Sequence, residues 1–194
     1  MERLAHGERR ALIVDAAYRV LAGHGFDAAT IKEIAREAGV APGLIHYYFA
    51  SKDELLVAVL QEAARRNTAA MQRLGDVTPA DELAEAALAE RKRRVLEEPA
   101  WYRLRYDLFA LGLRNPAIEP GLRDLLATGR RGIGAVVRRA LGDAAGDSEA
   151  LAAVLLGALD GLGLQKIADP DLDLEGAYGV VSALLAGLRD QART

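Results

Sequence analysis

The sequence predicts an all-helical protein, and three observations lead to that prediction. Alanine, leucine and glycine supply the bulk of the apolar residues, whereas only 5% of the 194 residues are aromatic. Apolar residues recur at helical spacing within segments that are separated by capping and stop signals. Runs of β-branched residues and Asn-Gly hairpin turns are absent from the sequence, so we expect no sheet.

The N-terminal part divides into helices at recognisable signals. A first helix is expected over residues 8–22, because residues 23–25 read Gly-His-Gly and Phe26 then suits a plug between helices. Two short helices follow, and a long one is expected over residues 51–74. Gly75-Asp76-Val77 should end that long helix.

Residues 30–52, TIKEIAREAGVAPGLIHYYFASK, have the pattern of a helix-turn-helix. Thr30 and Glu33 stand three apart, as a capping box requires. Gly39 can take the left-handed conformation that ends a helix. Pro42 suits the first turn of the second helix, where a missing N–H costs nothing. The segment therefore predicts two helices joined by a tight turn.

The second of these helices is expected to carry a DNA-facing surface. Ile45 and Phe49, four apart, would anchor it on one apolar side, and Ser51 with Glu54 forms a further capping box around Lys52. A short exposed helix with hydrogen-bonding side chains suits the major groove of DNA. The side chains left to face outward belong to Pro42, Gly43, Leu44, His46, Tyr47 and Tyr48.

The rest of the chain predicts further helices of ordinary length. Thr78-Pro79 is a start signal, and Pro99 should end the helix behind it. Loops are expected at residues 115–121, at residues 142–146 and around Asp169-Pro170-Asp171. The helices expected between these signals cover about residues 79–98, 100–114, 121–141, 148–168 and 174–191.

Composition bounds the function classes. The net charge of −3 does not exclude nucleic acid, because DNA binding needs a local basic surface rather than a basic chain. No cysteine and only three scattered histidines are present, so we expect no disulfide, metal site or cofactor. Charges interrupt every apolar run of membrane-span length, and the N-terminus lacks a signal-peptide pattern. We therefore expect a cytoplasmic protein with no membrane partner.

The last two expected helices each carry a strip of small residues. Such strips let helix axes approach closely, and two antiparallel helices of this kind can pair with a symmetry mate into a four-helix bundle. The alternative is that both strips pack inside one subunit. The predicted dimer residues are Ala153, Gly157, Gly161, Gly179, Ala183 and Gly187.

A candidate ligand pocket is predicted from the aromatic helix at residues 100–114 and from polar residues in the apolar helix that follows later. Asp160 lies in the apolar stretch LLGALDGLGL, and a buried carboxylate needs a partner or a ligand. The alternative is an ordinary body core, and the basic run at residues 91–94 is interpreted as a solvated helix face. The candidate ligand residues are Trp101, Tyr102, Arg105, Tyr106, Phe109, Asp160 and Gln165.

Residues 9–60 resemble the TetR family of bacterial transcriptional regulators, through GHGFDAAT, IKEIAREAGV, APGLIHYYF and SKDELL. The tail GALDGLGLQKIADPDLDLEGAY resembles a ligand-domain subgroup of that family with choline-responsive members, and it specifies no ligand for this chain. The resemblance implies that Thr30, His46, Tyr48 and Lys52 contact phosphates. It implies base contacts for Pro42, Gly43, Leu44 and Tyr47.

Three positions depart from the usual pattern of that family. Ala41 stands where serine or threonine is common, and Leu44 stands where threonine is frequent. Hydrogen-bonded base readout is therefore reduced, although Leu44 could contact a thymine methyl. His46 occupies a place where tyrosine is usual.

The sequence as a whole predicts a DNA-binding domain at residues 1–52 and a ligand-binding and dimerisation domain at residues 53–194. The expected function is a ligand-responsive regulator, acting as a repressor that binds a palindromic operator as a homodimer and is released by a small-molecule effector. Two alternatives stay open: a small-molecule sensor without DNA activity, and an all-helical enzyme. No catalytic constellation can be assembled from the residues, so the enzyme is the weaker of the two.

Overall fold

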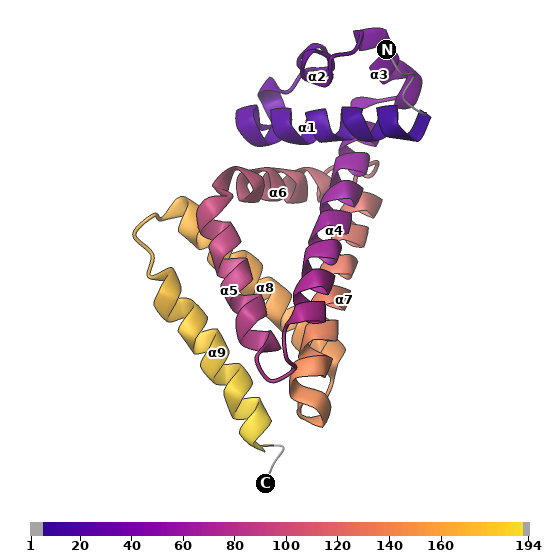
Figure 1. The fold of residues 1–194 in the computed structure, drawn as a ribbon. Helices are drawn as coiled ribbons and strands as arrows, with labels where there is room; N and C mark the ends of the chain where they lie inside the picture. The colour runs from indigo at the N-terminus through magenta and orange to yellow at the C-terminus, as the bar shows by residue number, and fades with distance from the viewer. Residues whose placement is uncertain (1–5, 192–194) are drawn as a thin grey trace. The chain divides into compact units, whose positions relative to one another are not determined.

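The computed structural model describes residues 6–191, apart from the side chains of residues 24, 26–28 and 191. Over this range it contains α-helices, one short 3-10 helix and no strand, so the all-helical prediction is confirmed (Figure 1). The helices are α1 (His6–Ala28), α2 (Ile31–Ala38), α3 (Pro42–Tyr48), α4 (Lys52–Val77), α5 (Leu83–Glu97), α6 (Pro99–Gly112), α7 (Glu119–Leu141), α8 (Ser148–Ala168) and α9 (Leu174–Gln191), with the 3-10 helix at Gly142–Ala145.

The chain forms two compact units. Residues 1–64 and 103–125 make up one, called the head unit, and residues 65–102 and 126–194 make up the other, called the body unit. Helices α4, α6 and α7 each contribute residues to both units. The predicted boundary at residue 52 was drawn by function and does not coincide with a boundary between these units, so it stays a prediction.

The head unit is built on the packing of its first three helices. Helix α2 contacts both α1 and α3. Ile13 of α1, Ile34 of α2 and Ile45 of α3 are each exposed by no more than 1%. Burial of these branched side chains away from water makes the main free-energy contribution that holds such short helices in place.

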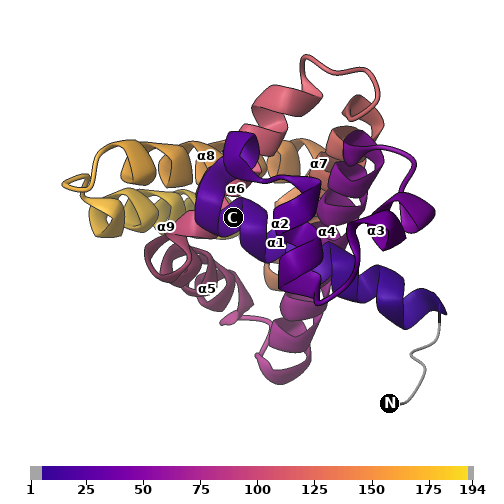
Figure 2. The ribbon, with the colours of Figure 1, turned by 90° about the horizontal axis from the view of Figure 1, so that it is seen from above.

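The body unit holds α8 and α9 beside α5. All three pairs among these helices are in contact, and Figure 2 shows α8 and α9 running side by side. Leu88 of α5, Leu156 of α8 and Leu185 of α9 are each buried. One side of α8 and one side of α9 are thereby committed to the core of the body unit.

Helix α1 runs beyond its predicted end. The prediction stopped it before Gly23, but helical structure continues to Ala28 with an interruption at Gly25, where φ is 77° and ψ is 173°. Glycine accepts that conformation at low cost, so the chain bends there and resumes a helical turn. The predicted role of Phe26 concerns a side chain that lies outside the described residues.

Helix α4 also runs further than predicted and ends at Val77. The longer helix is explained by a hydrogen-bond donor that reaches the carbonyl groups at its end. The Arg139 guanidinium donates to the carbonyl oxygens of Gly75 at 2.5 Å and Thr78 at 3.3 Å. Carbonyls at a helix end have no partner within the helix, so this arginine stabilises a turn that Gly75 would otherwise weaken.

Contrary to the prediction, Thr78-Pro79 does not begin the next helix. The Thr78 N–H donates to the Leu74 carbonyl at 3.1 Å, so Thr78 completes α4. A turn follows, and α5 begins only at Leu83. Pro99 begins α6 after α5 has ended at Glu97, because proline fits the first turn of a helix.

The later boundaries lie close to the predicted ones. The expected loop at residues 142–146 contains the short 3-10 helix. Asp147 caps α8, because its carboxylate accepts from the N–H groups of Glu149 at 3.1 Å and Ala150 at 3.0 Å. Helix α9 covers the same residues as the sequence predicts.

The stability of the head unit should depend on Gly39 more than on its other glycines. Its φ of 65° lies in the left-handed region, so Gly39→Ala should lower the free energy of unfolding by about 1–2 kcal/mol. The matched control is Gly43→Ala, which has no positive φ and an equally open Cβ position and should not lower it. Urea unfolding followed by circular dichroism measures both. Equal losses in the two variants would contradict this account of the turn.

Candidate nucleic-acid interface and ligand site

The start of α2 is closed by the predicted capping box. The Glu33 N–H donates to Thr30 Oγ1 at 3.2 Å, and the Thr30 N–H donates to Glu33 Oε2 at 3.2 Å. The Thr30 hydroxyl also donates to the Glu33 carboxylate at 3.3 Å. Thr30 is exposed, as a phosphate contact requires, but a phosphate at this position would compete with Glu33 for the hydroxyl.

The turn between α2 and α3 is fixed by backbone hydrogen bonds. The Val40 N–H donates to the Ala35 carbonyl at 2.9 Å, and the Gly39 N–H donates to the Arg36 carbonyl at 3.2 Å. These two bonds satisfy the last carbonyls of α2. Pro42 then occupies the first turn of α3, as predicted.

Helix α3 has one buried side and one exposed side. Ile45 and Phe49 are each 1% exposed, and the Arg10 guanidinium covers the Phe49 ring at 4.9 Å from its centroid. Tyr47 is 71% exposed. The other predicted contact residues are exposed or half-buried, namely Pro42, Gly43, Leu44, His46 and Tyr48.

His6 joins the aromatic residues of α3. Its ring centroid lies 4.6 Å from that of Tyr48 and 6.0 Å from that of Tyr47, and the two tyrosine rings lie 5.2 Å apart. His6 is not among the predicted contact residues, because no pattern in the sequence indicates that the first residue of α1 meets α3. Three rings thus form one exposed cluster at the surface predicted to face DNA.

Basic side chains border the same part of the head unit. A shallow hollow at the junction of α2 and α3 is lined by residues that include Thr30, Lys32, Arg36 and Pro42, and both of these cations are exposed. Lys52 is half-buried at the start of α4, whose first turn is capped by the Ser51 hydroxyl. Cations beside an exposed helix provide the local charge that phosphate binding needs.

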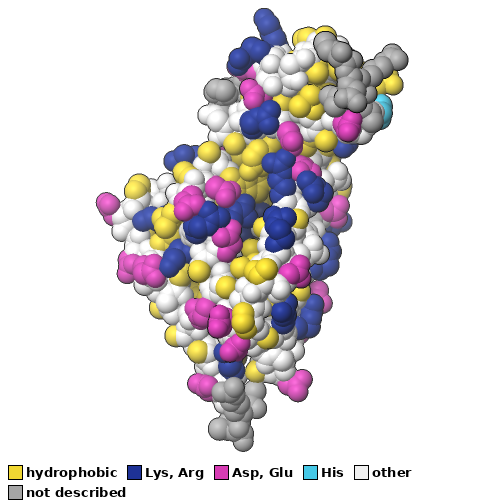
Figure 3. Space-filling model, viewed as in Figure 1, with side chains coloured by type: hydrophobic (Ala, Val, Ile, Leu, Met, Phe, Trp, Pro, Cys, Tyr) yellow, Lys and Arg dark blue, Asp and Glu magenta, His cyan; other side chains and the backbone are white. Residues whose placement is uncertain are grey.

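Charge is mixed on the face of the molecule that Figure 3 shows. Figure 3 shows basic and acidic side chains interspersed on one face, with apolar side chains between them. The described residues include no group of three or more histidine, cysteine, aspartate or glutamate side chains that could hold a metal ion.

The predicted ligand residues are divided between the two units. Arg105, Tyr106 and Phe109 belong to the head unit, where the Arg105 guanidinium lies 4.6 Å from the centroid of the Phe109 ring. Tyr106 and Phe109 meet edge to face at 6.1 Å. Gln165, in the body unit, is exposed and donates to the Gly161 carbonyl of its own helix at 3.3 Å.

A polar cluster does form inside the body unit. Asp160 is ion-paired with Arg91 of α5, and the two side chains are 12% and 16% exposed. The same guanidinium lies over the Tyr102 ring at 5.5 Å from its centroid, and Tyr102 is 1% exposed. Trp101, also a predicted ligand residue, is 8% exposed.

Tyr178 of α9 completes this cluster. It is 4% exposed and lies beside Arg91. Burial raises the pKa of Tyr178 well above its ordinary value, and the nearby Arg91 charge opposes that change only in part. We refer to Arg91, Tyr102, Asp160 and Tyr178 as the body cluster.

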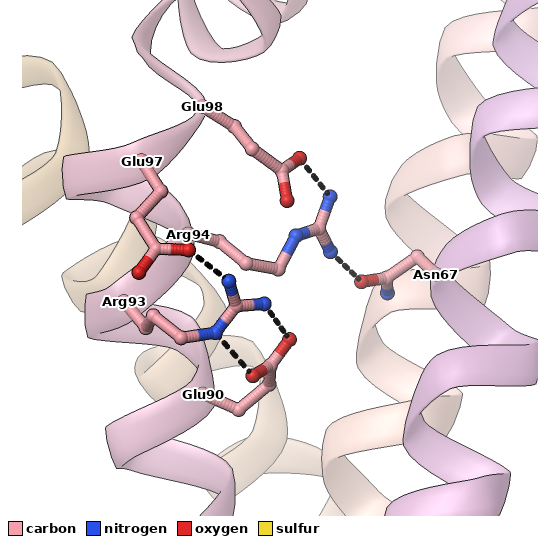
Figure 4. Close-up of polar contacts among 6 residues, drawn as sticks. All are labelled: Asn67, Glu90, Arg93, Arg94, Glu97 and Glu98. Atoms are coloured by element: carbon pink, nitrogen blue, oxygen red, sulfur yellow. Dashed lines mark hydrogen bonds and ion pairs between the residues drawn. The ribbon is translucent and has the colours of Figure 1, made fainter.

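The interpretation of residues 91–94 as a solvated face was wrong for two of them. Arg91 is mostly buried against Asp160, and Arg94 is 15% exposed and bridges Asn67 of α4 to Glu98 (Figure 4). Arg93 does face solvent, with pairs to glutamates on its own helix. A run of cations cannot reveal which members meet a carboxylate on another helix.

The predicted small-residue strips lie on the surface of the body unit. Gly161 is half-buried and the others are exposed, and a Cβ added at any of the four glycines would meet nothing within 4 Å. Large apolar side chains lie beside them, including Val154 at 68% exposure and Leu184 at 66%. Within one described chain, the strips do not pack against each other. Their residues are Ala153, Gly157, Gly161, Gly179, Ala183 and Gly187, called the small-residue face below.

The apolar character of α8 raises the question of a membrane. Among the described residues, α8 alone is long and apolar enough to span one by length and composition, with a mean hydropathy of 1.5. One third of that stretch is buried, and it contains the ion-paired Asp160. Core helices of soluble proteins can be equally long and apolar, so these two properties assign no membrane location.

The exposed α3 behind a tight turn, followed by the further helices α4 to α9, defines an all-helical helix-turn-helix protein. Residues 13–59 match the model of the bacterial regulatory proteins of the tetR family, and residues 79–190 match that of the C-terminal region of BetI-type transcriptional repressors. The second match spans more than half of the chain. The protein therefore belongs to the TetR family of bacterial transcriptional regulators, with a C-terminal region of BetI type.

Individual relatives agree with this assignment. The chain is 53% identical over 53 residues to the HTH-type transcriptional regulator BetI of Rhizobium meliloti, an alignment that covers 27% of this chain and 26% of that relative. The similarity thus spans about a quarter of the curated relative.

Solved structures extend the comparison to the whole fold. A transcriptional-regulator structure from Pseudomonas aeruginosa superposes with a TM-score of 0.79 at 24% identity, covering 98% of this chain and 94% of the other. One from Saccharomonospora viridis, solved in complex with choline, superposes with a TM-score of 0.72 at 21% identity, covering 93% and 97%. At these identities the similarity establishes the fold.

The raised pKa of Tyr178 makes stability depend on alkaline pH. Above about pH 10, the ordinary pKa of tyrosine, the unfolded chain releases a proton that folded Tyr178 retains, so the free energy of unfolding falls as pH rises. Tyr178→Phe should reduce that fall, by up to about 1.4 kcal/mol per pH unit. The change in the free energy of unfolding is measured by denaturant unfolding between about pH 9 and about pH 11, a range that brackets the reference pKa of tyrosine. The exposed control Tyr47→Phe should keep the wild-type slope, and equal slopes in both variants would disprove the assignment.

Proposed function

We propose that this protein is a ligand-responsive, DNA-binding repressor that binds a palindromic operator as a homodimer and is released by a small-molecule effector. The exposed side of α3 is the observation that carries the proposal. It presents Tyr47 and His46 outward while Ile45 and Phe49 hold the helix from behind. Membership of the TetR family supports the same function.

The roles proposed for the side chains of α3 follow from the contacts that each can make with bases or phosphates. We propose that Pro42, Gly43, Leu44 and Tyr47 meet base edges, with Leu44 against a thymine methyl. Backbone contacts give affinity and register without reading sequence. The proposed phosphate contacts are Thr30, His46, Tyr48 and Lys52.

The small-residue face supports the proposed dimer. An exposed apolar strip on two adjacent helices is a surface that a second copy can cover, because small residues allow close approach of helix axes. Two heads on one dimer would read half-sites spaced about 34–36 Å apart, one helical turn of DNA. We place this complex in the cytoplasm, where the operator would be.

For the effector, we propose an organic cation that binds in the body unit. The fold relative from Saccharomonospora viridis was solved with choline, which is a quaternary ammonium alcohol. In this chain, Tyr102 and Asp160 supply an aromatic face and a carboxylate, which are groups that recognise such cations. The effector can shift DNA binding only by its difference in affinity for the two states of the protein.

DNA binding can be tested with fluorescence anisotropy on the DNA upstream of the protein's own gene. Tight binding that exceeds binding to random DNA and falls steeply with salt is expected. Tyr47→Ala should abolish the preference for that DNA. Lys52→Ala should reduce the slope of log affinity against log salt by about 1, since one phosphate contact is lost.

The control for Lys52→Ala is Arg123→Ala, which removes the same charge from a 73% exposed side chain of α7 and should leave the slope unchanged. If the wild-type protein shows no preference for any DNA, including sequences selected from a random pool, the repressor proposal fails. A ligand-binding sensor without DNA activity would then be the better description.

The dimer can be tested with a charge placed on the small-residue face. Ala183→Arg should convert the dimer to a monomer in sedimentation equilibrium and weaken operator binding, because a buried unpaired charge opposes association. Leu113→Arg introduces the same charge at a site that is 80% exposed outside α8 and α9, and it should stay dimeric. A dimeric Ala183→Arg protein would show that the subunits associate through another surface.

A further inference from the structure

The body cluster already holds a cation, and that cation belongs to the chain itself. The Arg91 guanidinium is ion-paired with Asp160 and lies over the Tyr102 ring. A carboxylate and an aromatic face are the two groups that recognise an organic cation in a protein interior. Arg91 therefore occupies the place that the proposed cationic effector needs.

The two partners of this ion pair differ in how easily they can leave. Asp160 is a short side chain in the middle of α8, within the apolar sequence LLGALDGLGL, so its carboxylate can move only a short distance unless the helix moves. Arg91 has a long flexible stem and is 16% exposed, so its charged end can extend into solvent. Exchange of the cation is therefore the easier change.

The same comparison argues against an anionic ligand at this place. An anion that bound Arg91 would displace the carboxylate and leave Asp160 mostly buried beside a second negative charge, which is costly. A cation that displaces Arg91 leaves every buried charge with a partner. The buried Tyr178 hydroxyl lies beside Arg91, and once Arg91 has turned outward it is a group to which a hydroxyl on the ligand could bond.

We infer that Arg91 is an internal competitor of the effector: an organic cation binds by replacing the Arg91 guanidinium on Asp160 and Tyr102, and Arg91 thereby sets the affinity. This rests on the proposal that the body unit binds an effector. Only molecules with Arg91 turned outward are open to the ligand, so the apparent affinity is reduced by the fraction of such molecules. Removal of the guanidinium should therefore tighten binding.

The test is isothermal titration calorimetry with choline on the full-length protein. Arg91→Met keeps an unbranched stem without charge and should bind choline more tightly, on the order of tenfold if about a tenth of wild-type molecules are open. The neutral carbon isostere of choline, 3,3-dimethylbutan-1-ol, should gain nothing, because only a charged ligand replaces the charge of Arg91. Asp160→Asn should lose choline binding.

Two further variants keep the result interpretable. Arg93→Met makes the same substitution two positions away, at a side chain that is 47% exposed and pairs with Glu90 and Glu97 (Figure 4), and it should leave choline affinity unchanged. Arg91→Lys keeps a cation in place and folds without leaving Asp160 unpaired. It should bind choline more weakly than Arg91→Met does.

Unchanged or weaker choline binding in Arg91→Met would overturn the inference, as would full binding in Asp160→Asn. Binding of hexanoate that disappears in Arg91→Met would also overturn it, because Arg91 would then be a receptor for an anion. Operator binding of the same preparations is measured separately. Choline binding without operator binding would support the inference about Arg91 and refute the repressor proposal. Operator binding without choline binding would support the repressor proposal and refute the inference.

Discussion

Helix α3 has seven residues, which is too short for a helix to be stable on its own, and the candidate DNA-binding surface depends on this constraint. Ile45 and Phe49 supply the burial that the backbone of α3 cannot replace. Gly39 sets the angle at which the chain enters α3, and the bond from Val40 to Ala35 holds that angle. The outward residues of α3 are therefore held in place by two almost fully buried side chains and by the backbone of the preceding turn.

In the body unit, the corresponding constraint is the partly buried carboxylate of Asp160. A partly buried charge in the apolar middle of a helix must be satisfied from a neighbouring helix, and α5 provides Arg91. The guanidinium then lies on Tyr102, so one arginine links α5 to both α8 and α6. The pair joins the helices of the body and also defines a place where a cation is recognised.

Local signals predicted most helix positions because their physical causes lie within a few residues. Thr30 and Glu33 cap α2 as their spacing requires, and Pro42 begins α3. Thr78-Pro79 misled the prediction, since Thr78 is used to complete α4. The extension of α4 to Val77 depends on Arg139, which is distant in sequence and gives no local sign of its role.

The sequence by itself determined the all-helical class, the helix-turn-helix and the residues of α3 that face outward, because capping, turn geometry and helical periodicity act over short spans of chain. It also indicated that Asp160 needs a partner. Tertiary structure alone decided that this partner is Arg91, that Tyr178 lies beside them and that His6 meets the tyrosines of α3. Each of these contacts joins helices far apart in the chain, where the packing of whole helices, rather than any local pattern, brings side chains together.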